Sequence, residues 1–272
     1  MTNNRYKLLV MDADGTIFGK NRSILPEDKE AVRRALEQGV TVSLSTGRTM
    51  LSALKILDML SLDGFHIFCD GAHVSNPSTG EEIHCHPLNK ELVREAIDFA
   101  HANNINLELF STHHYFVERE SWNTDIRLKF FGVKSTVVNF SDIWEREVII
   151  KGTLVVSPEE RDQADCFEQR FKGELAFSRT GTPAYPDIGF LNIVTPGVSK
   201  GKGLEALASH LDIPLSQIMA IGDHDNDIPL LTTAGFSVAM GNAIDEVKAI
   251  ADHVTLDIEH AGVAAAIKKF LL

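Results

Sequence analysis

The sequence has 272 residues, a formal net charge of −12, 44% apolar residues and 24% charged residues. Such a composition is typical of a globular chain long enough for one large or two modest domains. The negative charge argues against a surface that binds nucleic acid or an anionic membrane, so a phosphorylated ligand would need local cations to hold it. No apolar run approaches the roughly 20 residues that span a bilayer.

The cysteines and the first residues indicate a cellular compartment. Cys69, Cys85 and Cys166 are odd in number and far apart in the sequence, which argues against a disulfide framework. The apolar run before Asp12 is too short for the core of a secretory signal. We therefore expect a cytoplasmic protein that has neither a membrane nor a nucleic acid as its partner.

Strand and helix patterns alternate over the first 70 residues. The expected elements are a strand at 7–11, a helix at 26–38, a strand at 40–44, a helix at 50–60 and a strand at 66–69. In the first helix, Val32, Ala35 and Leu36 are expected on one face. Repeated strand–helix units predict a parallel sheet with right-handed crossovers.

The pattern changes after about residue 82 and returns near residue 195. An amphipathic helix is expected at 90–103, adjacent strands follow it, and Ser157 to Glu160 has the form of a capping box. Trp122 and Trp144 are expected in the core of this segment, with the lining of a substrate pocket as the alternative. The chain is therefore predicted to have an α/β, Rossmann-like core formed by residues 1–82 and 190–272, with an α+β domain inserted at 83–189.

Two carboxylates, Asp12 and Asp14, follow the first strand directly. The carboxyl ends of strands are where open α/β sheets bind their ligands. An aspartate can attack phosphorus, and a second carboxyl can donate and accept a proton. Taken alone, the pair also fits a solvated turn at the end of a strand.

Anion-binding groups follow the second strand. Thr46 offers a hydroxyl and Gly47 an unobstructed backbone N–H close to the start of a helix, where an anion is favoured, although an ordinary helix N-cap explains them equally well. Further on, Gly197 to Gly203 is not a P-loop, because its glycine spacing is one residue short. Lys200 in this segment lies at the start of a helix, where the helix dipole disfavours a positive charge. We therefore expect an anion opposite it.

A second acidic group, Asp223, Asp225 and Asp227, follows an apolar strand at 218–221. Bringing these residues to Asp12 and Asp14 would cost about 4 kcal/mol for each pair of charges 4 Å apart. A hard divalent cation would offset this cost, and ligands that are all oxygen favour Mg²⁺. His73, His84, Cys85 and His86 lack the spacing of a zinc site and are expected to be ordinary surface or half-buried residues.

These segments together resemble the haloacid dehalogenase superfamily of phosphatases, specifically its Cof-type subfamily, which has a large α/β cap inserted after the third core strand. The resemblance covers the core, at residues 5–82 and 190–272, and it implies a role for each matching position. Asp12 would be the nucleophile, and Asp14 would protonate the leaving group and then activate water. The residues implied in phosphate binding are Ala13, Thr46, Gly47, Lys200 and Asn226. The residues implied in metal binding are Asp12, Asp14 and Asp223, and Asp227 and Arg48 would support the site.

The chain departs from the family pattern at the end of the third strand, where Asp70 replaces the usual asparagine before Gly71. The sequence leaves open what Asp70, His224 and Asp225 do. The resemblance implies a Mg²⁺-dependent phosphomonoesterase that acts on a sugar phosphate or a phosphorylated cofactor through an aspartyl-phosphate. A phosphomutase would share all four motifs, and a catalytically silent metabolite-binding regulator would be expected to lack the nucleophile or a metal carboxylate, all of which are present here.

Overall fold

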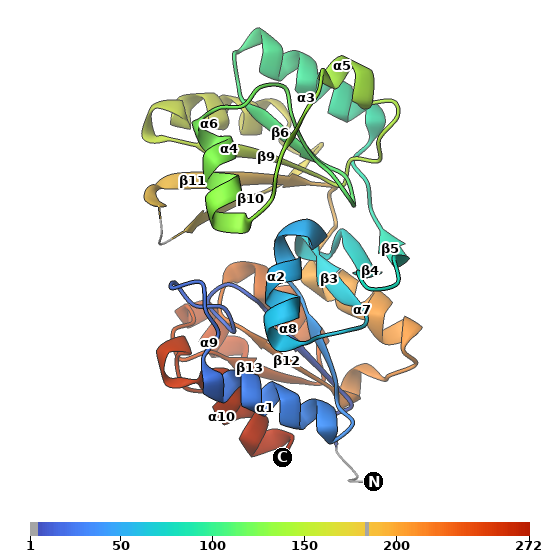
Figure 1. The fold of residues 1–272 in the computed structure, drawn as a ribbon, viewed down its shortest axis with the longest axis vertical. Coiled ribbons are helices and arrows are strands. Elements are labelled where there is room, and N and C mark those ends of the chain that lie inside the picture. The colour runs from blue at the N-terminus through green and yellow to red at the C-terminus, as the bar shows by residue number, and fades with distance from the viewer. Residues whose placement is uncertain (1–4, 183–184) are drawn as a thin grey trace. The chain divides into compact units, whose positions relative to one another are not determined.

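The computed structural model describes residues 5–182 and 185–272. The chain forms two compact units, drawn in Figure 1. The first unit contains Met1–Arg48, Ala53–His84 and Ser199–Leu272, and the second contains Thr49–Ser52 and Cys85–Val198. Segments from both ends of the chain therefore share one unit, and most of the middle of the chain forms the other.

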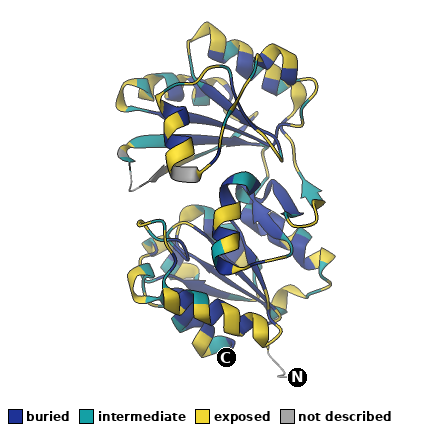
Figure 2. Ribbon diagram, viewed as in Figure 1, coloured by how far each residue is buried: buried dark blue, intermediate teal, exposed yellow. Residues whose placement is uncertain are grey.

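The first unit is built on a five-stranded sheet with the strand order β14, β13, β12, β1 and β2. Every neighbouring pair in this sheet is parallel, which confirms the predicted α/β fold. The strand bounds are Leu8–Met11 for β1, Thr41–Leu44 for β2, Ile218–Gly222 for β12, Phe236–Ala239 for β13 and His253–Val254 for β14. β1 and β12 are buried throughout, as Figure 2 shows, because a parallel sheet is covered on both faces.

The helices that pack around this sheet do so in pairs, α1 against α10 and α7 against α8. Their bounds, with those of α2 and α9, are Pro26–Glu37 for α1, Met50–Leu60 for α2, Lys200–His210 for α7, Ile228–Thr233 for α8, Asp245–Ile250 for α9 and Gly262–Phe270 for α10. Asp28 of α1 is buried and accepts a hydrogen bond of 2.7 Å from the backbone N–H of Ala264 in α10. The buried residues of α1 are Asp28, Ala31, Val32 and Ala35, and Leu36 beside them is 36% exposed.

A small sheet extends this unit beyond β2. It has the strand order β3, β4 and β5, with bounds His66–Phe68, His73–Asn76 and Glu81–Cys85. In the part of the chain that the structure describes, β3 meets the large sheet through a single parallel bridge between Ser45 and Ile67. The third strand was predicted, but its two partners in this sheet were not.

The second unit contains a six-stranded sheet with the order β10, β11, β9, β6, β7 and β8. Its neighbouring strands are antiparallel apart from β7 and β8. The bounds are Leu107–Phe110 for β6, Tyr115–Val117 for β7, Thr136–Val137 for β8, Lys151–Val156 for β9, Ala176–Thr182 for β10 and Tyr185–Val194 for β11. The helices are Lys90–Ala102 (α3), Trp122–Ile126 (α4), Phe140–Ile143 (α5) and Arg161–Arg170 (α6).

The core of the second unit joins α3 and α6 to one face of its sheet, with Ile97, Phe167 and Leu154 among the buried residues. The capping box before α6 is confirmed, and its Ser157 N–H donates to a carboxylate oxygen of Glu160 at 3.0 Å. Trp144 packs against this core as predicted. The prediction for Trp122 was wrong, because this first residue of α4 is 39% exposed while the helix buries its neighbouring positions.

Among the described helices, none combines the length and the apolar character needed to cross a membrane.

Candidate active site

The loop after β1 places Asp12 at the carboxyl edge of the parallel sheet. The backbone N–H of Asp12 donates to the carbonyl of Ile221 at 2.9 Å, which fixes the end of β1 to β12. The carbonyl of Ala13 accepts backbone hydrogen bonds from residues 16, 17 and 18, so the loop turns tightly. Gly15 has a φ of 92°, and a Cβ there would lie 2.3 Å from a carboxylate oxygen of Asp223. Glycine is therefore required where the two strand ends approach each other.

Lys200 forms an ion pair with two of the predicted site carboxylates. Its Nζ lies 2.5 Å from Oδ1 of Asp12 and 2.6 Å from Oδ1 of Asp227, and the side chain is fully buried. Burial opposes the charge, but Asp12, Asp227 and Asp70 raise the pKa of Lys200 above its ordinary value, so the ammonium form is held. The anion expected opposite this lysine is thus supplied by the protein's own aspartates.

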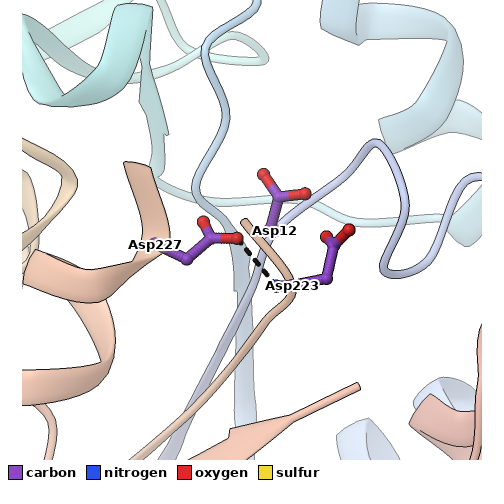
Figure 3. A group of neighbouring side chains, drawn as sticks. All are labelled: Asp12, Asp223 and Asp227. Atoms are coloured by element: carbon purple, nitrogen blue, oxygen red, sulfur yellow. Dashed lines mark hydrogen bonds between the residues drawn. The ribbon is translucent and has the colours of Figure 1, made fainter. Parts of the chain in front are cut away.

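Three carboxylates, from Asp12, Asp223 and Asp227, gather at this edge of the sheet (Figure 3). Each offers an oxygen within 4.8 Å of the other two. Asp223 accepts a hydrogen bond of 2.8 Å from the hydroxyl of Thr16, and Asp227 accepts from the backbone N–H groups of Asp223 and His224 at 2.9 and 3.0 Å. These contacts aim the carboxylates at one another even though like charges repel.

The crowding of the carboxylates changes their acidity. Burial raises the pKa of Asp12 well above its ordinary value, the charges of Asp227 and Asp223 add to this effect, and Lys200 opposes it. Burial and Asp227 similarly raise the pKa of Asp223 to about 6. The cluster therefore has more negative charge than its one ammonium group offsets. Its donors are all carboxylate oxygens, so the residues fit a hard divalent cation such as Mg²⁺.

Asp14 lies apart from this cluster and pairs with Arg48. Nε and a terminal nitrogen of Arg48 lie 2.6 and 2.7 Å from the two carboxylate oxygens of Asp14. The guanidinium is almost buried, with its carbon 5.3 Å from the centre of the Phe18 ring, while the side chain of Asp14 is 49% exposed. The structure thus brings together Asp12, Asp223 and Asp227 but turns the carboxylate of Asp14 toward Arg48.

The other predicted phosphate-binding residues lie in the turns after β2 and β12. The hydroxyl oxygen of Thr46 accepts a hydrogen bond of 3.1 Å from the N–H of Arg48, and α2 begins four residues after Thr46. Asn226 donates from Nδ2 to Oδ1 of Asp70 at 2.8 Å. His224 and Asp225 are exposed, and the backbone of His224 both donates to the carboxylate of Asp227 and accepts from its N–H.

Sequence reasoning missed Asn242, which lies just beyond β13. Its Nδ2 donates to the carbonyl of Gly15 at 2.9 Å and lies 3.5 Å from Oδ2 of Asp223, while its Oδ1 accepts from the N–H of Ile258 at 2.9 Å. The side chain thus ties the loop after β1 to the loop before α10. The signal that could have found it is the one that identified Asp12 and Asp223, namely a polar residue just after a buried strand.

The histidines and cysteines of the small sheet do not join the carboxylates. Over residues 5–182 and 185–272, the cluster of Asp12, Asp223 and Asp227 is the one group with metal-binding geometry. Nε2 of His73 instead lies 2.8 Å from a carboxylate oxygen of Glu82. His84, Cys85 and His86 are half-buried or exposed as predicted, but the prediction was wrong for His73, which is buried.

A lysine bonded to a strand-end aspartate beside further carboxylates is suited to phosphoryl transfer, in which positioning and charge stabilisation do most of the work. A family model of haloacid dehalogenase-like hydrolases matches residues 9–267. The chain therefore belongs to this family, as its sequence motifs predicted.

Individual relatives agree with this assignment. Phosphatase YwpJ of Bacillus subtilis is 27% identical over 292 residues, which cover 97% of this chain and 100% of that protein. The 5-amino-6-(5-phospho-D-ribitylamino)uracil phosphatase YitU of the same organism is 26% identical over 268 residues, 97% of each chain. A haloacid dehalogenase-like hydrolase from Bacteroides thetaiotaomicron has the same fold, with a TM-score of 0.86 and 25% identity over 97% of this chain and 99% of the other. The protein is a phosphatase of this family.

Proposed function

We propose that this phosphatase hydrolyses a small phosphorylated metabolite in two steps, through a phosphoryl group held on Asp12, and that it requires Mg²⁺. The observation that carries the proposal is the hydrogen bond of 2.5 Å between Lys200 and Oδ1 of Asp12. This contact keeps one oxygen of the carboxylate fixed and charged, which leaves the other oxygen to attack phosphorus.

In the first step, an oxygen of Asp12 forms a bond to phosphorus while the bond from phosphorus to the leaving oxygen breaks. The leaving oxygen takes the electron pair of that bond, and Asp14 gives it a proton. Both carboxylate oxygens of Asp14 accept hydrogen bonds from Arg48, so at least one of these contacts must break when Asp14 carries the proton. In the second step, a water molecule attacks phosphorus, Asp14 takes its proton, and inorganic phosphate leaves Asp12.

The metal ligands in this proposal are Asp12, Asp14 and Asp223, with Asp227 in support. A bound Mg²⁺ would neutralise charge on the phosphoryl oxygens. Because the carboxylate of Asp14 pairs with Arg48, Asp14 would hold the metal through its main-chain carbonyl. Asp227 acts indirectly, since its carboxylate accepts hydrogen bonds from Lys200 and from the backbone of Asp223.

The phosphate itself would contact Ala13, Thr46, Gly47, Lys200 and Asn226, which the family resemblance implies and which belong to the same unit as Asp12. Specificity for the leaving group is assigned to the inserted segment, residues 83–189, because it carries none of the four motifs. A phosphorylated sugar or cofactor is the substrate class we propose. The relative named for a ribityl phosphate supports a polyhydroxylated leaving group.

A phosphate-release assay over a panel of sugar phosphates and phosphorylated cofactors tests this function. We expect release of inorganic phosphate with Mg²⁺, none in excess chelator, and inhibition by Ca²⁺, whose larger and looser coordination shell misplaces the nucleophile. Asp12→Asn should fold normally and lose essentially all activity, because an amide is a poor nucleophile. Full activity in chelator would refute the metal requirement, and an isomerised phosphorylated product without phosphate release would identify a phosphomutase instead.

A further inference from the structure

Asp70 is brought to the site by a turn of unusual backbone geometry. The residues after β3, Cys69, Asp70 and Gly71, have consecutive positive φ angles of 51°, 55° and 100°. Left-handed residues other than glycine are uncommon, and two in succession persist only where the surroundings enforce them. A Cβ on Gly71 would lie 2.0 Å from the carbonyl oxygen of Ser199, so the turn packs tightly against the start of α7. The position of Asp70 is therefore fixed relative to Lys200.

The side chain of Asp70 contacts the residues assigned to the phosphate. Its Oδ1 accepts the hydrogen bond of 2.8 Å from Nδ2 of Asn226. Its backbone N–H donates to the carbonyl of Thr46 at 3.1 Å. Its carboxylate also lies over Gly47, where a Cβ would be 3.0 Å from Oδ2. Asp70 thus borders three of the proposed phosphate-binding residues, two of them through its carboxylate.

Charge, more than hydrogen bonding, distinguishes this side chain from a neutral one. Asp12, Asp70, Asp223 and Asp227 are carboxylates, while Lys200 is the cation that pairs with Asp12 and Asp227. Arg48 and Asp14 neutralise each other. With a divalent cation bound, these four carboxylates, Lys200 and the cation together carry one net negative charge. A carboxamide at residue 70 would make this sum neutral. The site with a carboxylate at residue 70 therefore repels a phosphate dianion and attracts a metal cation more strongly than the neutral site would.

We propose that Asp70 sets the charge of the phosphate-binding pocket, so that the divalent cation is held more tightly and the phosphate group more loosely. This inference rests on the proposed function and assigns to Asp70 the role of promoting release of inorganic phosphate. The carboxylate acts from behind Gly47 and Asn226, and it exchanges no atom or proton with the substrate.

The variant Asp70→Asn isolates the charge. An asparagine tolerates the left-handed conformation and can still accept the hydrogen bond from Asn226 through its amide oxygen. Intact-mass measurement checks that the introduced amide has not deamidated back to aspartate. Asp58→Asn is the matched control, because Asp58 is an exposed residue near the end of α2 and its loss changes the net charge equally.

Calorimetric titrations without turnover measure the two affinities, first for MgCl₂ and then for inorganic phosphate in saturating Mg²⁺. We expect Asp70→Asn to bind Mg²⁺ about tenfold more weakly and phosphate about tenfold more tightly, and Asp58→Asn to change neither. If phosphate binding to the native protein is too weak to detect, binding that becomes measurable in Asp70→Asn supports the proposal. Parallel losses of both affinities would assign Asp70 a purely structural role, and unchanged affinities would exclude any electrostatic one.

These outcomes are separate from the test of the function. A native protein that releases no phosphate from any substrate contradicts the proposed function, whereas the two titrations still report on Asp70. Conversely, the native enzyme can be active while Asp70→Asn shows no opposite shifts in the two affinities. This result would support the proposed function and contradict the role given to Asp70. In an active enzyme, product inhibition by phosphate should also strengthen about tenfold in Asp70→Asn.

Discussion

Arg48 binds Asp14 through two hydrogen bonds of 2.6 and 2.7 Å, one to each carboxylate oxygen. This paired contact fixes both the position and the plane of the carboxyl group. In the proposed reaction, Arg48 thus positions the group that takes a proton from water in the second step.

Replacing Arg48 should consequently affect hydrolysis of the phosphoryl-Asp12 intermediate more than its formation. We expect Arg48→Met to lower kcat about tenfold to a hundredfold with a smaller effect on KM, because a positioning contact is lost while phosphate binding persists. Enzyme labelled from a substrate with a good leaving group and then quenched should contain more phosphoenzyme than the native protein.

Arg48→Lys is the informative companion variant. A lysine keeps the charge but cannot form the paired contact, so it should restore only a small part of kcat. Full recovery of kcat with lysine would show that charge alone matters. A kcat unchanged in both variants would show that Arg48 has no role in the reaction.

Lys200 is expected to stabilise the fold as well as the site. Lys200→Met leaves Asp12 and Asp227 buried without their cation, which should lower the free energy of unfolding by about 3 to 5 kcal/mol at pH 8. The pKa values of Asp12 and Asp223 are already raised, so these groups take up protons in the folded state as the pH falls. The difference in the free energy of unfolding between Lys200→Met and the native protein should therefore become smaller toward pH 5.5.

Urea denaturation at the two pH values measures this effect. Lys202→Met is the control, because Lys202 lies on the same helix but is exposed and pairs with Glu205 at the surface. Its removal should change stability by less than about 1 kcal/mol. An equal loss in both lysine variants, independent of pH, would contradict the role of the buried ion pair.

Asn242 should act on metal affinity through the loop it holds. Asn242→Ala removes the contacts to the carbonyl of Gly15 and to Asp223, so we expect Mg²⁺ to bind about tenfold more weakly in a calorimetric titration. An unchanged Mg²⁺ affinity in Asn242→Ala would show that the metal site does not depend on these contacts.

His66 should make the fold sensitive to acid. Its Nδ1 accepts a hydrogen bond of 3.1 Å from the N–H of Leu44, and its Nε2 is buried with no partner among the described residues. Burial lowers the pKa of His66 to about 4 from an ordinary value near 6.5, with Asp63 opposing weakly. The unfolded chain thus binds the proton first, and stability is lost as the pH falls from 6.5 toward 4.

The loss from this one group should be about 2 kcal/mol between pH 7 and pH 5. Because other groups also titrate in this range, the measurement compares unfolding of the native protein with that of His66→Phe at both values. The variant should lose less stability on acidification than the native protein, whereas the exposed control His113→Asn should follow the native protein. Identical pH dependence in the native protein and His66→Phe would mean that His66 is solvated.

The sequence determined the fold class and the order of the motifs, because strand and helix periods and turn residues are local properties. The apolar run before Asp12 and the apolar run before Gly222 predicted two buried strands, and both lie in the parallel sheet. The expectation that Lys200 faces an anion came from the helix dipole alone, and the anions proved to be Asp12 and Asp227. The boundaries of the inserted domain and the roles of the site residues stay predictions.

Only the tertiary structure decided which side chains meet. Asp14 follows Asp12 by two residues, yet its carboxylate pairs with Arg48 while Asp227, from the far end of the sequence, joins the acidic cluster. Burial was decided in the same way, since Trp122 is exposed although its residue type favours a core. The physical reason is that long-range contacts depend on the register of strands and on the packing of turns, as where Asp70 reaches Asn226 across 156 positions. Local propensity carries no information about such pairs.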